Sequence, residues 1–362
     1  MPETVYDQLS KRLDTLGVGY PKMDSGVEYT LLKYFFSEEE AGYVAEMEDK
    51  YETASEYATR TKHEPGRSAI ILEGLAKKSL IFRQHKDGEV RYRPIPVAHG
   101  IYEFNVKNLN TKWLPDFFEQ VLKGLVHNVF ATKVPFFRIV PISQDVTADS
   151  KLLQYDDASE MIRKARIVAV TECVCRKVGA VFGNPCKNSL ERCLTLNDAA
   201  DYYIENGIGH QISTEEALKS VEDSINDGLI LQVINSKQAE VICACCKCHC
   251  GELVLMNMAG VDAPGRKVVS NYVCLPDRRI CDQSCSDVCV GACAAGAWSK
   301  TEAGELRFSG KHCVGCGQCV RQCPKHALKL VAKAEINIFE PAADMWDGYT
   351  AIAKERSAQA KP

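Results

Sequence analysis

Hydrophobic and polar positions in the first hundred residues change from a helical pattern to strand alternation. Helices are predicted for four segments: residues 26–36, 37–47, 55–61 and 64–78. In the first of these, the apolar residues recur at helical spacing. Ser37 and Pro65 stand where two of these would begin, at positions that favour a capping hydroxyl and a first-turn proline. Residues 80–97 instead alternate around Asp87 and Gly88, which predicts a two-stranded hairpin.

Further elements are predicted along the rest of the chain. Residues 112–130 read as an amphipathic helix, and Ser213 with Glu216 forms a capping box for a helix that ends at Gly228. The expected strands are the apolar runs 167–170 and 229–234 and an alternating hairpin across 298–308. We expect a short helix from Lys325 onward. Together these elements predict an α+β protein of several domains.

Composition narrows the class of protein. The 362 residues are 46% hydrophobic and 25% charged with a net charge of −4, as in ordinary globular proteins, which excludes fibrous and mostly disordered chains. No stretch approaches the ~18 apolar residues of a membrane span, and the N-terminus lacks a secretion signal. We therefore expect a cytoplasmic protein.

Cysteine content is the unusual property of the chain. All 18 cysteines lie between Cys173 and Cys323, and the first 172 residues have none. A disulfide-stapled protein would be small and secreted, whereas clustered thiols in a reducing compartment are more often metal ligands. The chain thus divides into a cysteine-free part that builds its own core and a cysteine-dense part that uses metal.

The strongest motif lies near the C-terminus. Cys313, Cys316, Cys319 and Cys323 are separated by two, two and three residues and are followed by Pro324. Three thiolates on so short a loop can reach one cluster only if the backbone turns sharply, which Gly315 and Gly317 allow. Upstream, four more cysteines recur every fourth residue: Cys281, Cys285, Cys289 and Cys293. The alternative is a pair of zinc sites, which more often use paired CxxC knuckles.

Residues 274–332 resemble the two-cluster bacterial ferredoxins. The first cysteine run departs from that family in having three-residue gaps where two are usual and Ala294 where proline is usual. The resemblance implies two [4Fe-4S] clusters, one held by Cys281, Cys285 and Cys289 with Cys323, the other by Cys313, Cys316 and Cys319 with Cys293.

Nine further cysteines lie upstream in two groups, each following an expected strand: Cys173, Cys175, Cys186 and Cys193; Cys243, Cys245, Cys246, Cys248 and Cys250. We expect them to converge on one or two more [4Fe-4S] clusters, with zinc as the alternative. The pattern resembles cysteine-rich segments fused upstream of ferredoxin modules in anaerobic bacteria. His249 is expected to be an exposed bystander rather than a ligand, and Cys274 a small buried hydrophobe.

The order of elements before residue 98 resembles a winged-helix domain, with residues 65–78 in the position of the recognition helix and 79–97 as the wing. The wing carries Arg83, Lys86, Arg91 and Arg93, which could contact phosphates. Residues 1–110 nevertheless carry 15 bases against 18 acids. This balance favours protein docking over DNA binding.

The expected organisation has five parts: a winged-helix-like domain (1–108), a helical connector (109–165), a cysteine-rich metal-binding domain (166–262), a two-cluster ferredoxin-like domain (263–335) and a C-terminal tail (336–362) whose Phe339, Trp346 and Tyr349 anchor on the body or on a partner. The chain has no GxGxxG or GxxxxGK[ST] motif. Electrons would then enter and leave through redox partner proteins. We expect an electron-transfer component of an anaerobic oxidoreductase complex, acting as a hetero-oligomer. The alternative is a redox-sensing winged-helix regulator that carries iron–sulfur clusters.

Overall fold

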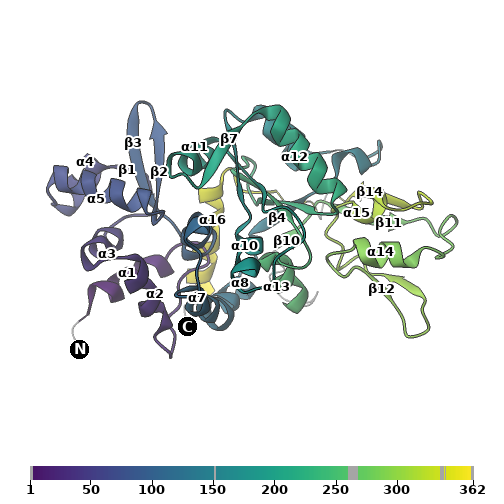
Figure 1. Cartoon of the computed structure of the whole chain (residues 1–362), viewed down its shortest axis with the longest axis horizontal. Coiled ribbons are helices and arrows are strands. Elements are labelled where there is room, and N and C mark those ends of the chain that lie inside the picture. Colours follow the sequence, from purple (N-terminus) through teal and green to yellow (C-terminus); the bar gives the residue numbers. More distant parts are fainter. Residues whose placement is uncertain (1–2, 151, 260–267, 335–337, 339, 360–362) are drawn as a thin grey trace.

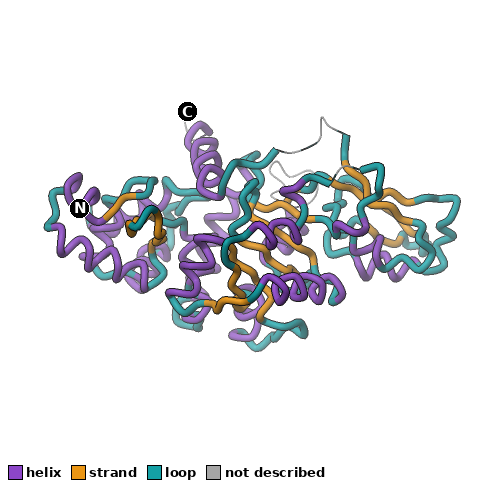
Figure 2. The backbone as a smooth tube through the Cα atoms, turned by 90° about the horizontal axis from the view of Figure 1, so that it is seen from above, coloured by secondary structure: helices purple, strands orange, loops and turns teal. Residues whose placement is uncertain are grey.

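The computed structural model describes residues 3–150, 152–259, 268–334, 338 and 340–359. The chain is elongated, with a helical N-terminal part at one end, a large sheet in the middle and a small cysteine-rich module at the other end (Figure 1). Figure 2 shows the same order from above, with most of the strands in the central part.

The N-terminal part contains five helices and a three-stranded antiparallel sheet of order β1-β3-β2. All four expected helices and the expected hairpin are present, and Asp87 and Gly88 form the hairpin turn with φ of 54° and 79°. The first helix was not predicted. The elements are α1 (Val5–Asp14), α2 (Val27–Phe35), α3 (Glu38–Ala45), β1 (Glu52–Thr53), α4 (Ala54–Thr61), α5 (Pro65–Lys77), β2 (Ile81–Lys86) and β3 (Glu89–Pro94).

Next in the chain come short helical segments. The amphipathic helix expected over 112–130 is formed by three consecutive pieces, and its Trp113, Leu114 and Phe117 are buried in the N-terminal core. The segments are η1 (Val97–Ile101), α6 (Tyr102–Phe104), η2 (Val106–Asn108), α7 (Leu114–Gln120), η3 (Val121–Leu125), α8 (Val126–Ala131), η4 (Ser143–Asp145), η5 (Gln154–Asp156) and α9 (Ala158–Lys164).

The middle of the molecule is a seven-stranded sheet of order β10-β4-β8-β9-β6-β5-β7, antiparallel except for the pair β10 and β4. Its strands are β4 (Phe137–Val140), β5 (Val168–Glu172), β6 (Glu191–Leu196), β7 (Gly209–Ile212), β8 (Ile230–Ile234), β9 (Val241–Cys245) and β10 (Val268–Val269). The expected strands at 167–170 and 229–234 are β5 and β8. Because β4 joins this sheet, the sheet crosses the boundary expected at residue 165, and the boundary expected at 262 lies outside the described residues.

Four helices accompany this sheet: α10 (Val174–Val181), α11 (Asn197–Glu205), α12 (Thr214–Asn226) and α13 (Gly251–Ala259). The predicted capping box of α12 is confirmed, with Ser213 and Glu216 each accepting a hydrogen bond from the other's backbone N–H. Helix α11 also packs against the N-terminal part, where the rings of Tyr202 and Phe82 stack at 4.8 Å. The N-terminal part therefore shares one apolar core with helices α10 and α11, which accompany the sheet.

The C-terminal module consists of two small sheets and two short helices. Its elements are β11 (Tyr272–Pro276), α14 (Ser286–Ala292), β12 (Trp298–Lys300), β13 (Leu306–Phe308), α15 (Gln318–Arg321) and β14 (Leu328–Ala332). The hairpin expected over 298–308 is confirmed as β12 and β13. The helix expected from Lys325 is wrong. This segment forms β14 because Leu328 and Leu330 are buried while Lys329 between them is exposed, a two-residue period that suits pairing with β11.

The C-terminal helix α16 (Met345–Gln359) lies between the N-terminal part and the sheet (Figure 1). Trp346 packs edge-on against Tyr51 and Phe82, and Tyr349 stacks on Phe136 at 5.5 Å. The expected anchoring of Trp346 and Tyr349 is therefore confirmed, on the body of the chain itself. Phe339 lies outside the described residues.

A buried ion pair joins the sheet to the C-terminal module. Arg138 of β4 is fully buried and donates to Asp156 Oδ1 at 2.7 Å, while Asn271, just before β11, donates to the other carboxylate oxygen at 3.0 Å. Burial raises the pKa of Asp156, and the charge of Arg138 acts against that rise. The carboxylate thus depends on Arg138 to remain charged inside the protein.

We expect Arg138→Met to lower the free energy of unfolding by about 3–5 kcal/mol, because it leaves a buried carboxylate unpaired. The measurement is chemical denaturation under anaerobic conditions. Arg163→Met is the matched control: its side chain is 55% exposed and pairs with Glu160 on the same helix, so we expect a change within about 0.5 kcal/mol. Equal effects of the two substitutions would contradict this account.

Candidate metal centres

The loop that carries Cys313, Cys316 and Cys319 turns at two glycines, as the sequence predicts. Gly315 and Gly317 have φ of 61° and 90°, in the left-handed region that favours glycine. A Cβ on Gly315 would lie 2.2 Å from the carbonyl oxygen of Tyr272, so no side chain fits there. The loop is thereby held against β11.

Five thiols line one small cavity of this module: Cys274 and the four of one expected ligand set, Cys293, Cys313, Cys316 and Cys319. The Cys293 sulfur accepts from the Ala297 backbone N–H at 3.1 Å. The Cys313 sulfur accepts from the backbone N–H groups of Cys274 and Gly315, each at 3.4 Å. Backbone donors aimed at sulfur stabilise the thiolate form, which is the form that binds metal. The residues present therefore fit a cluster at this cavity.

The other expected set, Cys281, Cys285, Cys289 and Cys323, also gathers in the module. Cys281, Cys289 and Cys323 share one packed group with Trp298. Burial raises the pKa of Cys289 to about 12, and negative charge on Cys319, Cys323, Cys285 and Cys281 adds to that rise. Crowded thiols of this kind require a cation before they can all ionise.

Cys274 is buried, as expected of a small hydrophobic residue, but it also lines the cavity of the first set. A hydrogen bond with the Cys319 thiol, followed by burial, raises the pKa of Cys274. The raised pKa of Cys274 and the lowered pKa of Cys319 indicate that Cys274 keeps its proton and donates a hydrogen bond to the Cys319 sulfur.

Six of the nine upstream cysteines form a closed ring on the central sheet: Cys173, Cys175, Cys250, Cys245, Cys243 and Cys193, in order around the ring. They come from the end of β5, the first turn of α10, the middle of β6, both halves of β9 and the residue before α13. The expected convergence of the two cysteine groups thus occurs, although two of the six ligand candidates lie within strand β9, which was not predicted.

Hydrogen bonds between neighbouring thiols divide the ring into two kinds of group. Hydrogen bonds from Cys193 and Cys245 lower the pKa of Cys243 to about 5, and such bonds also lower the pKa of Cys173 and Cys250. The pKa values of the three thiols between them are raised. The lowered pKa values of Cys173, Cys243 and Cys250 favour negative charge at the ring, so the ring suits a cationic iron–sulfur core.

The ring faces a cavity of about 160 Å³ that is lined on its other side by aromatic residues, among them Tyr102, Phe117 and Phe137. His99 and two carboxylates also line it. His99 Nε2 lies 3.3 Å from Glu252 Oε1 and 4.0 Å from Glu103 Oε1. The imidazole of His99 stacks on the Phe136 ring, with the two ring centroids 3.9 Å apart. Sequence reasoning missed His99 and Glu103 because they lie far from any cysteine in the chain.

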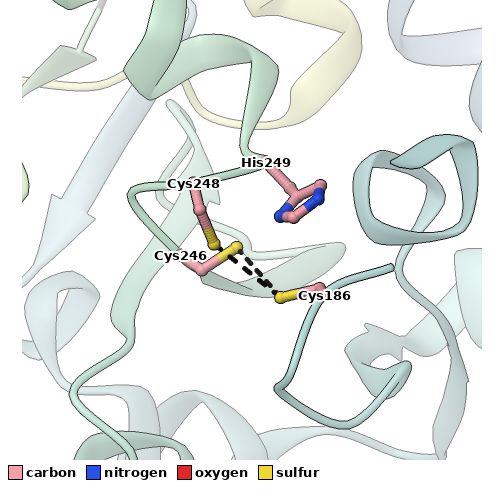
Figure 3. A group of neighbouring side chains, drawn as sticks. All are labelled: Cys186, Cys246, Cys248 and His249. Carbon is pink, nitrogen blue, oxygen red and sulfur yellow. Dashed lines mark hydrogen bonds between the residues drawn. The ribbon is translucent and has the colours of Figure 1, made fainter. Parts of the chain in front are cut away.

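The remaining three upstream cysteines form a separate group with His249 (Figure 3). The Cys186 sulfur lies 3.9 Å from that of Cys246 and 3.8 Å from that of Cys248. One ligand atom from each of the four residues lies within 4.8 Å of all the others. His249 is half-buried and turned toward the thiols, so the expectation that it is exposed is wrong. The turn after β9 places the imidazole of His249 against α10, a contact that the local sequence could not reveal.

Strand alternation explains why consecutive cysteines go to different groups. In β9, Cys243 and Cys245 face the ring, whereas Ala244 and then Cys246 face the opposite side of the sheet. Arg176 of α10 is fully buried and donates to the Ala244 carbonyl. Burial alone would lower the pKa of Arg176, but negative charge on Cys173 and Cys246 raises it. One guanidinium thus offsets charge in both groups.

The basic residues of the expected wing are largely occupied by ion pairs. The Arg83 side chain is 5% exposed and lies 2.7 Å from Glu73 and 2.6 Å from Glu205 of α11. The Arg93 side chain is 10% exposed, pairs with Asp49 at 2.8 Å and lies over the Trp346 ring. Arg91 pairs with Glu89 at 2.7 Å, whereas Lys86 is exposed. The base of the β2–β3 hairpin is therefore packed against the body of the protein, whereas its tip from His85 to Val90 is exposed.

Comparison with known proteins gives one match. A family model described as a 4Fe-4S binding domain matches residues 309–329, which include Cys313, Cys316, Cys319 and Cys323. No curated protein and no solved structure matches the chain. A 4Fe-4S domain together with this many cysteines fits an iron–sulfur electron-transfer role. No helix in the described part of the chain is long and apolar enough to cross a membrane.

We expect Gly315→Ala to prevent cluster assembly in the C-terminal module, because the new Cβ would collide with the Tyr272 carbonyl and strain the backbone. Iron content and visible absorbance of anaerobically purified protein are the measurements. Gly310→Ala is the matched control on the same loop, since a Cβ there lies 3.9 Å from its nearest neighbour. Full iron content in both variants would contradict the proposed tight fit of the loop.

Proposed function

We propose that this protein transfers single electrons between redox partner proteins through three [4Fe-4S] clusters. Two would lie in the C-terminal module, on the two cysteine sets implied by the ferredoxin resemblance. The third would lie in the six-thiol ring. Each cluster would supply one-electron redox chemistry, while the protein holds it, excludes water and sets its potential through hydrogen bonds to sulfur.

One observation carries this proposal: the six-thiol ring and the module's cysteine set that contains Cys293 and Cys316 pack against the same apolar core. Cys245 and Cys250 of the ring belong to this core with Ala294, Ala295 and Val314. Three partly buried cysteines pack against this core: Cys243 from the six-thiol ring, and Cys293 and Cys316 from the module. The two sites are thus joined by packed protein without intervening bulk solvent, as an internal electron path requires.

Polar contacts hold the module on the sheet in a fixed position, which supports the same path. The Gln318 side chain donates to the carbonyl oxygens of Ile225 and Leu229 at 3.0 and 2.8 Å. Asn257 donates to the Ala294 carbonyl at 3.0 Å, and the Ile142 backbone N–H donates to the Cys316 carbonyl at 3.1 Å. Fixed geometry keeps the distance between clusters, and therefore the transfer rate, constant.

We further propose that the chain works as a subunit or dedicated partner of an oxidoreductase complex, because it lacks a nucleotide-binding motif and needs protein donors and acceptors. The winged-helix-like part would serve docking. Its paired and buried arginines argue against the alternative of a redox-sensing DNA-binding regulator, since phosphate contacts need free cationic side chains.

The proposal predicts about twelve irons and about twelve inorganic sulfides per chain in anaerobically prepared protein. Cys316→Ser should remove about four irons and one EPR signal of the reduced module, because it removes one cluster ligand. Cys250→Ser should remove the same amount from the ring and leave the module signals unchanged. An iron content of about eight per chain that does not change in Cys250→Ser would contradict a cluster in the ring.

A DNA-shift assay with the same protein separates the two functions. We expect no sequence-selective, salt-sensitive binding in either the oxidised or the reduced state, because Arg83 and Arg93 are held in ion pairs. Tight binding that is lost when the clusters are oxidised would favour the regulator instead.

A further inference from the structure

Cys186, Cys246, Cys248 and His249 are the one group in the described part of the chain in which a ligand atom from each residue lies within 4.8 Å of all the others. The Cys186 sulfur is 3.9 and 3.8 Å from those of Cys246 and Cys248. Tetrahedral zinc with Zn–S bonds of about 2.3 Å places its sulfurs about 3.8 Å apart. In a [4Fe-4S] cube each thiolate binds a different iron atom, so the cube holds the sulfurs farther apart. The spacing fits one ion rather than a cluster.

The hydrogen bond of His249 gives independent support. Its Nε2 lies 2.8 Å from the backbone oxygen of Asn184, which can only accept, so Nε2 carries the proton. In a neutral ring the lone pair is then on Nδ1. This atom is buried and has no hydrogen-bond partner among the described residues. A histidine that binds metal commonly donates its other N–H to a carbonyl in this way.

The surrounding backbone makes room for the imidazole. A Cβ on Gly179 of α10 would lie 2.4 Å from His249 Cδ2 and 2.7 Å from the Asn184 oxygen, so only glycine allows the ring this position. Asn188 donates to the Cys186 sulfur at 3.6 Å. Fully buried Arg176 of α10 provides a positive charge on this side of the sheet.

We propose that Cys186, Cys246, Cys248 and His249 bind a single structural zinc ion. Three thiolates and one imidazole complete a tetrahedral shell and leave no open position for catalysis. The ion would tie the segment after α10 to the turn after β9. Cys245 and Cys250 flank that turn and belong to the six-thiol ring, so the zinc would fix the ring's shape without taking part in electron transfer. The zinc site does not depend on the proposed electron-transfer function.

Elemental analysis and zinc K-edge X-ray absorption of the full-length, anaerobically purified protein test this proposal. We expect about one zinc per chain, with three sulfurs at about 2.3 Å and one nitrogen at about 2.0–2.1 Å. Cys248→Ser should lower the zinc content at least about tenfold while the iron content stays unchanged. Cys250→Ser is the matched control from the same turn, and it should lose iron but keep zinc.

Other results would overturn the proposal. One is wild-type protein without stoichiometric zinc whose iron content falls by about four in Cys248→Ser, since this indicates a second upstream cube. If Cys248→Ser loses both zinc and iron, the variant His249→Cys distinguishes the alternatives. Zinc that is retained with four sulfur neighbours supports the site, whereas loss of zinc overturns the proposal. Zinc present without iron would contradict the proposed function but leave the zinc site standing.

Discussion

Mutual repulsion among buried thiolates is the constraint on which the second half of this protein depends. Six thiols surround one cavity on the sheet, and nine more share a small module whose apolar core consists largely of cysteines. In a low-dielectric interior such groups cannot all ionise unless a cation lies among them. The raised pKa of Cys289 and the alternation of raised and lowered pKa values around the ring both express this constraint. We therefore expect metal binding and folding to be coupled in this half.

The N-terminal part has no cysteines, and its hairpin and all but the first of its helices could be predicted from local sequence. Capping residues such as Ser37 and the two-residue turn at Asp87 and Gly88 act within a few positions of the chain, so local pattern is enough to place them. What the pattern could not reveal is that Arg83 turns inward to Glu205, 122 residues away. The basic residues of the β2–β3 hairpin look free in sequence, but Arg83 and Arg93 are held in ion pairs in the structure, which leaves fewer cationic side chains for phosphate contacts.

The terminal 4Fe-4S motif was predictable from sequence, whereas the grouping of the upstream cysteines was not. Spacing alone identified the terminal ferredoxin-like run, because its ligands lie on one loop. The upstream cysteines could not be sorted in this way, since Cys245 and Cys246 are neighbours in the chain but face opposite sides of β9. Assigning them needed the unpredicted strand β9 and its pairing with β6 and β8. His249 was misjudged for the same reason, because its partner Asn184 lies 65 residues away.

The central claim is that the ring and the module hold iron–sulfur clusters close enough to exchange electrons. EPR spectroscopy of the fully reduced protein tests it most directly, because neighbouring paramagnetic clusters broaden and split each other's signals. The account predicts a magnetically coupled spectrum that becomes simpler when the ring cluster is removed by Cys250→Ser. A spectrum that is the plain sum of isolated clusters, unchanged by that substitution, would contradict it.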